Sequence, residues 1–205
     1  MVKLDNITII DNFFAEEDFA KVFELSKKMI RCADTSAHFV WDAPLYPICL
    51  GKIKEITSLK PVHPFQTSCY IRHAPKHYGP AGYLHHDLNN SGLGSYPYTF
   101  ILYIEVDEVG EQQELIFPYY NSDKELVSNE FTEICCDLYE NGKYILPDTM
   151  GDMKLELLRR KDEFFKVSPK NNRAIFWKNN PQSSHCPDLS GELGFRRNIV
   201  VSLTE

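Results

Sequence analysis

No apolar stretch of this 205-residue chain approaches the roughly 20 residues that a helix needs to cross a bilayer. The first ten residues, MVKLDNITII, lack the apolar run of a secretion signal. The six cysteines include no CxxC pair, a spacing typical of thiol exchange and of zinc sites. We therefore expect a soluble, cytoplasmic protein with reduced thiols and no membrane partner.

An excess of basic residues is also missing, because 22 Lys and Arg stand against 29 Asp and Glu, for a formal net charge of -7. Broad binding to nucleic acid depends on clustered Lys and Arg that neutralise phosphates. Two small basic clusters, at residues 27–28 and 159–161, lie in segments with a helical pattern, where we expect solvated faces. We therefore expect no nucleic-acid partner.

The chain has no internal repeat and no break in composition, so residues 1–205 are expected to form a single domain. An apolar stripe with Phe19, Val22 and Phe23 predicts a helix near the N-terminus. Turn-bounded apolar runs then predict an antiparallel barrel or double sheet with helices packed outside it. The predicted strands are residues 7–10, 67–72, 98–106, 114–118, 164–167, 173–177 and 195–203.

Two segments depart from the strand pattern. Residues 31–66 are irregular, and their four prolines would interrupt any long helix, so no order of elements is predicted there. Residues 119–163 have the character of a helical insertion, with helices at 124–139 and 151–162 and turns at 141–142 and 147–148. The insertion could fold over the mouth of the barrel as a lid, which would favour a small enclosed substrate.

A candidate metal site begins at residues 85–87, which read HHD. In extended backbone His85 and Asp87 project to the same side and can converge on one metal ion, although such a tripeptide often arises by chance. His185, just beyond the strand predicted at 173–177, can complete the set. Two imidazoles and one carboxylate on one face of an iron leave three positions open, which suits a chelating 2-oxo acid and O₂.

The far carboxylate of 2-oxoglutarate would need a cation, and arginine offers a permanently charged fork that matches a carboxylate with two hydrogen bonds. Arg196, at the start of the last predicted strand, is the candidate. Alternation along a strand places Arg196 and Asn198 on one face and Arg197 on the other, so the two arginines cannot both point into the barrel. Which of the two binds the carboxylate is left open.

With these features the sequence resembles the iron(II)- and 2-oxoglutarate-dependent dioxygenases, and within them the prolyl 4-hydroxylase-like group. The resemblance covers most of the chain outside residues 31–66 and 119–163. One departure is the QQEL of residues 112–115, where the group usually has a glycine pair before the Glu. The blocks that agree in order are residues 11–14, 83–87, 99–104, 114–118, 167–170 and 173–177, together with His185 and Arg196.

The resemblance implies a mainly β fold with flanking helices, in which a double-stranded β-helix (a jelly-roll, cupin-like core) carries N-terminal helices and the helical insertion. It implies an enzyme that binds iron(II), 2-oxoglutarate and O₂, with ascorbate as a possible reductant. The implied iron ligands are His85, Asp87 and His185, the implied 2-oxoglutarate anchor is Arg196, and Tyr70 and Tyr103 match aromatic positions that line the cosubstrate pocket.

The implied reaction decarboxylates 2-oxoglutarate to succinate and CO₂ and oxidises an unactivated C–H bond of a substrate. Asp87 favours hydroxylation, because Ala or Gly in its place would free a position for halide, whereas desaturation and ring formation stay open. The substrate is either a prolyl or other residue within a peptide, or a free amino acid or small metabolite. The alternative function is a non-catalytic barrel that binds a metal or ligand as a sensor or scaffold.

Several residues near these motifs also have simpler interpretations. His86 could replace His85 as a ligand, but it has no carboxylate two residues on and is expected to point away or to support the site. His73 and His77 could touch substrate, but surface loops often carry histidines. Cys186 is expected to be a small buried residue and not a catalytic thiol. Nothing in the sequence indicates the oligomeric state.

Overall fold

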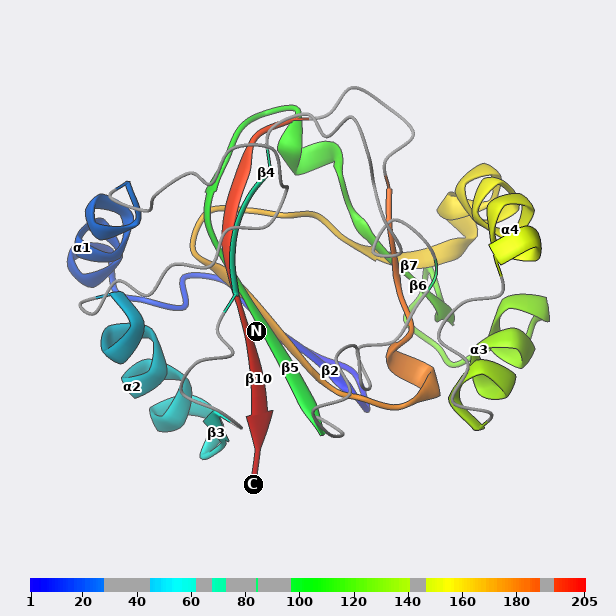
Figure 1. Ribbon diagram of the computed structural model, residues 1–205, viewed down its shortest axis with the longest axis horizontal. Helices are drawn as coiled ribbons and strands as arrows, with labels where there is room; N and C mark the ends of the chain where they lie inside the picture. Colours follow the sequence, from blue (N-terminus) through cyan, green and yellow to red (C-terminus); the bar gives the residue numbers. More distant parts are fainter. Residues whose placement is uncertain (28–44, 62–67, 73–83, 85–96, 141–146, 189–193) are drawn as a thin grey trace.

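The computed structural model describes residues 1–27, 45–61, 68–72, 84, 97–140, 147–188 and 194–205. Within these residues two antiparallel sheets face each other, and a pair of helices lies on the outer side of each sheet (Figure 1). The structure is therefore of mixed α/β class. No helix among the described residues is long and apolar enough to span a membrane.

The larger sheet has seven strands in the order β1-β2-β8-β5-β10-β3, with β4 also paired to β10. Residues 98–106 form a central strand, as predicted, because β5 is hydrogen-bonded to β8 on one side and to β10 on the other. The strands are β1 (Val2–Lys3), β2 (Ile7–Ile10), β3 (Lys60–Pro61), β4 (Ser68–Arg72), β5 (Tyr98–Val106), β8 (Arg173–Lys178) and β10 (Arg196–Thr204).

The smaller sheet has the order β7-β6-β9, formed by β7 (Phe164–Val167), β6 (Leu115–Asn121) and β9 (Cys186–Pro187). One hydrophobic core lies between the sheets, where the ring centroids of Phe117 in β6 and Trp177 in β8 are 6.1 Å apart. The predicted strands are confirmed to within one residue at each end, except that β6 continues to Asn121 and shortens the insertion accordingly.

Helices α1 (Glu16–Ser26) and α2 (Leu45–Thr57) cover the outer face of the large sheet, at the left of Figure 1, over a second apolar core. Val22 is buried in this core and Phe19 and Phe23 pack against it, which confirms the predicted N-terminal helix. The sequence did not predict α2, although Pro47 is compatible with it. Pro47 lies in the first helical turn, where a backbone N–H has no intrahelical partner to lose.

Helices α3 (Glu130–Glu140) and α4 (Pro147–Arg159) lie at the right of Figure 1, on the outer side of the small sheet. Two of their side chains, Phe131 and Leu157, are buried in the core that contains β6. The predicted starts of both helices were wrong. Residues before 130 complete the β6 region, and Pro147, interpreted as a turn, is instead the first residue of α4, a position that suits proline. Closure of the insertion as a lid stays a prediction.

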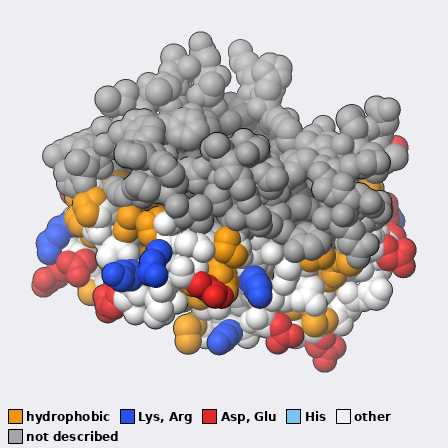
Figure 2. All heavy atoms as spheres, turned by 60° about the horizontal axis from the view of Figure 1, so that its bottom comes forward, with side chains coloured by type: hydrophobic (Ala, Val, Ile, Leu, Met, Phe, Trp, Pro, Cys, Tyr) orange, Lys and Arg blue, Asp and Glu red, His pale blue; other side chains and the backbone are white. Residues whose placement is uncertain are grey.

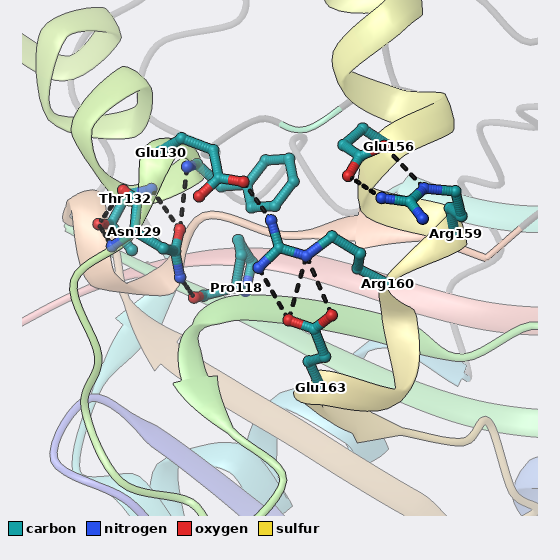
Figure 3. A network of polar contacts seen from close by, with 9 residues as sticks. Pro118, Asn129, Glu130, Thr132, Glu156, Arg159, Arg160 and Glu163 are labelled. Atoms are coloured by element: carbon teal, nitrogen blue, oxygen red, sulfur yellow. Dashed lines mark hydrogen bonds and ion pairs between the residues drawn. The ribbon is translucent and has the colours of Figure 1, made fainter.

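An ion-pair network joins the start of α3 to the segment that follows α4 (Figure 3). The Arg160 guanidinium pairs with Glu163 at 2.8 Å and with Glu130, the first residue of α3. The same guanidinium lies over the rings of Phe131 and Phe164, at 5.5 and 5.8 Å from their centroids. Arg160 therefore fastens the start of α3 to the segment that leads from α4 into β7.

Asn129 caps α3 and also connects it to β6 (Figure 3). Its Oδ1 accepts from the backbone N–H groups of Phe131 and Thr132 at 2.9 and 3.1 Å, and its Nδ2 donates to the Pro118 carbonyl at 2.9 Å. The Thr132 hydroxyl in turn accepts from the Asn129 N–H at 2.9 Å, which completes a reciprocal cap.

Substituting Asn129→Ala should lower the free energy of unfolding by about 1 kcal/mol, because two helical N–H groups lose their acceptor. Urea denaturation followed by circular dichroism measures the change. Asn129→Asp keeps the acceptor and loses only the donation to Pro118, so its loss should be smaller than that of Asn129→Ala. Equal midpoints for Asn129→Ala and the wild type would contradict the capping role.

The described surface carries charges of both signs. On the described part of the face in Figure 2, Lys and Arg side chains lie among Asp, Glu and apolar side chains. Several charged side chains among the described residues pair within one helix, as Lys21 does with Asp18 and Arg159 with Glu156. Such exposed pairs add little stability.

Candidate active site

His185 lies between the two sheets. It follows the 3₁₀ helix Pro181–Ser183, directly precedes β9, and is 4% exposed. Its ring centroid is 4.9 Å from that of Trp177 and 5.6 Å from that of Phe117. Because Trp177 belongs to the large sheet and Phe117 to the small one, the imidazole is enclosed by aromatic side chains from both.

The backbone sets which nitrogen of His185 can bind a metal. Nδ1 is 3.0 Å from the Ser183 carbonyl oxygen, which can only accept, so Nδ1 donates and the lone pair of the neutral ring is on Nε2. A capping box between Asn180 and Ser183 holds that carbonyl in place. Ligating histidines commonly donate their second N–H to a backbone carbonyl, so His185 fits a metal ligand that binds through Nε2.

Arg196 also faces the space between the sheets. Only 3% of the residue is exposed, and Nη1 donates to the carbonyl oxygen of Gln113 at 3.4 Å. Gln113 is itself buried and stands just before β6, so the side chain extends from the large sheet toward the small one. A guanidinium in this position can attract a carboxylate strongly, because little water is present to screen the charges.

Arg197 points the opposite way. Its Nη1 is 2.7 Å from Glu105 Oε2 and 3.1 Å from the hydroxyl of Ser26, which lies in α1 on the outer face of the large sheet. The guanidinium also lies 5.5 Å from the centroid of the Phe195 ring. The expectation that the two arginines occupy opposite faces is confirmed, and only Arg196 faces the inter-sheet space.

A β-bulge determines where Tyr103 points. The register between β5 and β10 shifts so that Arg197 lies opposite Glu105 and Asn198 lies opposite Tyr103, which leaves Ile104 without a partner in β10. Ile104 packs on the helix side, and Tyr103 belongs to the inter-sheet core. The extra residue therefore turns Tyr103 to the face that Arg196 occupies.

The backbone of Tyr70 lies close to that of Tyr103 in the large sheet. In β4 it pairs with Asn198, whose partner on the other side is Tyr103, so the three residues form one row across three strands. Asn198 is buried and was not among the predicted site residues. The Tyr70 side chain lies outside the described residues.

His85 and Asp87, the other two predicted ligands, lie outside the described residues, as do His73, His77 and His86. The residue before His85 is described: Leu84 is 1% exposed and belongs to the same core as Trp177 and Phe117, which enclose His185. Among the described residues no three His, Cys, Asp or Glu side chains form a metal-binding group, and only one of the three predicted ligands is among them.

Cys186 is completely buried, and burial raises the pKa of its thiol to about 12. Cys49, in α2, is also buried, with its pKa likewise raised to about 12. Cys136, in α3, is exposed and lines a cavity of about 520 Å³ between α3 and the 3₁₀ helix Pro181–Ser183. This cavity lies outside the inter-sheet space, and we assign it no role in the chemistry.

Alkylation of the folded protein with iodoacetamide at neutral pH should modify Cys136 at least about tenfold faster than Cys49 and Cys186, because the thiolate is the reactive form. Peptide mass spectrometry with fragmentation distinguishes Cys136 from the adjacent Cys135. In urea, which unfolds the protein, these three cysteines should be alkylated at similar rates. Rapid modification of Cys186 in the folded protein would contradict its burial in β9 of the small sheet.

No protein-family model matches this sequence, and no curated protein matches it. Among solved structures, the viral collagen prolyl hydroxylase of Paramecium bursaria Chlorella virus-1 is similar, with a TM-score of 0.51 and 14% identity over 97% of this chain and 91% of that chain. The two chains share a fold. HygX from Streptomyces hygroscopicus, with nickel and 2-oxoglutarate bound, has a TM-score of 0.47 and 9% identity over 96% of this chain and 81% of that chain.

The similarity to the prolyl hydroxylase extends over nearly the whole of both chains. It confirms, for the fold, the resemblance to iron(II)- and 2-oxoglutarate-dependent dioxygenases that the sequence motifs indicated.

Proposed function

We propose that this chain is an iron(II)- and 2-oxoglutarate-dependent dioxygenase with a double-stranded β-helix core. One observation carries the proposal: a buried imidazole and a buried guanidinium, His185 and Arg196, both face the space between the sheets in a fold shared with a collagen prolyl hydroxylase. These groups have the chemistry needed for a metal ligand and for a carboxylate anchor.

In this proposal His185 would hold iron(II) through Nε2 together with His85 and Asp87. When bound, the metal and 2-oxoglutarate supply the activation of O₂ that oxidises a C–H bond. The Ser183 carbonyl keeps the proton of His185 on Nδ1, and the rings of Trp177 and Phe117 exclude water from the imidazole.

Arg196 would neutralise the far carboxylate of 2-oxoglutarate, and Tyr103 and Tyr70 would line the same pocket. A carboxylate at Asp87 favours hydroxylation over halogenation. The similar solved structure is of a collagen prolyl hydroxylase, so prolyl residues in peptides are the first substrates to test. Free amino acids and other small metabolites are the second class.

The test is to incubate purified protein with iron(II), ascorbate and 2-oxoglutarate and to screen proline-containing peptides, free amino acids and small metabolites for substrate-dependent succinate. We expect bound iron and stimulation of succinate formation by one substrate class. Iron binding without succinate from any substrate would favour a sensor, and a protein that binds neither iron nor 2-oxoglutarate would refute the proposal.

A further inference from the structure

The connection between β5 and β6 carries the chain from the large sheet to the small one, and one carboxylate fixes its geometry. Asp107 Oδ1 accepts from the Gly110 N–H at 2.6 Å, and Oδ2 accepts from the Phe195 N–H at 2.8 Å. The Asp107 N–H in turn donates to the Phe195 carbonyl at 3.1 Å. Asp107 thus joins the connection to the residue directly before Arg196.

The same two segments are in backbone contact. A Cβ on Gly110 would lie 2.6 Å from the Phe195 carbonyl oxygen, and a Cβ on Gly194 would collide with the backbone nitrogen of Gly110. No side chain fits between the segments, so their separation is set by backbone atoms and by the Asp107 carboxylate that lies beside both glycines.

The segment that Asp107 fixes also supplies a contact of Arg196. The 3₁₀ helix Gly110–Gln112 begins at the glycine bound by the Asp107 carboxylate, and the Gln113 N–H donates to the Gly110 carbonyl at 3.1 Å. The Gln113 carbonyl then accepts from Arg196 Nη1. Asp107 therefore fixes the backbone at two places next to Arg196. One is Phe195, the preceding residue, and the other, through Gly110, is Gln113, whose carbonyl the Arg196 guanidinium contacts.

We propose that Asp107 is a positioning residue that orients Arg196 for a carboxylate ligand by fastening the β5–β6 connection to the start of β10. The ligand class, 2-oxoglutarate, rests on the proposed function, whereas the positioning of the guanidinium does not. Asp107 touches neither substrate nor cofactor in this scheme and acts through Arg196.

The direction in which Asp107 variants change the affinity for 2-oxoglutarate distinguishes a positioning role from an effect of the negative charge. Asp107 is an anionic residue close to an anion site, so if only its charge mattered, the neutral variants would bind 2-oxoglutarate more tightly. Positioning predicts the opposite. Asp107→Asn keeps one acceptor oxygen of two and should weaken binding about threefold, and Asp107→Ala, which keeps neither, about tenfold.

Anaerobic calorimetric titration of the iron(II)-loaded protein with 2-oxoglutarate measures these changes. Partial unfolding would lower the stoichiometry and leave the Kd unchanged, whereas positioning raises the Kd at a stoichiometry close to that of the wild type. Glu108→Ala is the matched control, because it removes the same charge from the next, exposed residue, and its Kd should stay within twofold of the wild type. In an Arg196→Met background the effect of Asp107→Asn should vanish.

A second measurement does not depend on 2-oxoglutarate. The Arg196 Nε atom is buried, so in ¹⁵N-labelled protein its N–H should exchange slowly in the wild type and in Glu108→Ala and faster in Asp107→Asn and Asp107→Ala. If the wild type fails to bind 2-oxoglutarate, the proposed function fails, and the exchange measurement still decides the role of Asp107. Unchanged Arg196 exchange, or tighter 2-oxoglutarate binding in Asp107→Asn, would overturn the inference.

Discussion

Replacement of Arg196 by Met should raise the Kd for 2-oxoglutarate about a hundredfold, on the order of 3 kcal/mol. Methionine fills a similar volume but offers no donor, so the far carboxylate would enter a buried site with neither hydrogen bonds nor a counter-charge. Titration of the iron(II)-loaded variant measures the change, and thermal unfolding in parallel shows whether the variant is folded.

Arg197→Met is the matched control for this substitution. It removes the same charge from the neighbouring residue, but on the helix side of the sheet, where the guanidinium pairs with Glu105 and Ser26. We expect some loss of stability and a Kd for 2-oxoglutarate within about threefold of the wild type. A hundredfold effect in Arg197→Met, or none in Arg196→Met, would show that the anchor is assigned to the wrong arginine.

His185→Ala should abolish stable iron binding and reduce succinate formation by at least about a hundredfold. Removing a group that only supports a ligand typically lowers metal affinity or activity about ten- to hundredfold, and removing a ligand itself should lower them further. Iron content after desalting and succinate release measure the two effects. The variant also leaves a gap between Trp177 and Phe117, so its folding is to be checked by circular dichroism.

Ser184→Ala provides a control at the adjacent position. The Ser184 hydroxyl is buried and has no hydrogen-bond partner among the described residues, so its removal should leave iron binding near the wild-type level. If His185→Ala kept its iron, the proposed metal centre would be refuted. If Ser184→Ala also lost iron, the effect of His185→Ala would have to be assigned to local packing.

Local patterns in the sequence predict the strands well. The strands at residues 7–10, 98–106 and 164–167 have the predicted bounds, because each is a short apolar run limited by polar turn residues. The helix α2 was missed because the prolines of residues 31–66 are read as helix breakers, although Pro47 lies in a first turn that tolerates proline. The start of α4 was misplaced for the same reason.

The sequence indicated parts of the candidate site only where the residue type itself points to a role. The sequence singled out His185 and Arg196 and placed Arg196 and Arg197 on opposite faces by alternation alone. It could not show that the carbonyls of Ser183 and Gln113 hold the two site residues, because backbone atoms carry no residue-specific signal. The contacts of Asp107 were missed because its partners are main-chain N–H groups, one of them at Phe195, 88 residues along the chain.

The unpaired residue in β5 also affects how this strand can change in length. Deleting Ile104 would make the ladder with β10 regular and would leave Tyr103 opposite Asn198 and Glu105 opposite Arg197, so both side chains would keep their present faces. Tyr103 and Val106 would then remain in the core between the sheets. Evolution of this strand can therefore lose the single codon for Ile104 without turning a neighbouring side chain to the other face.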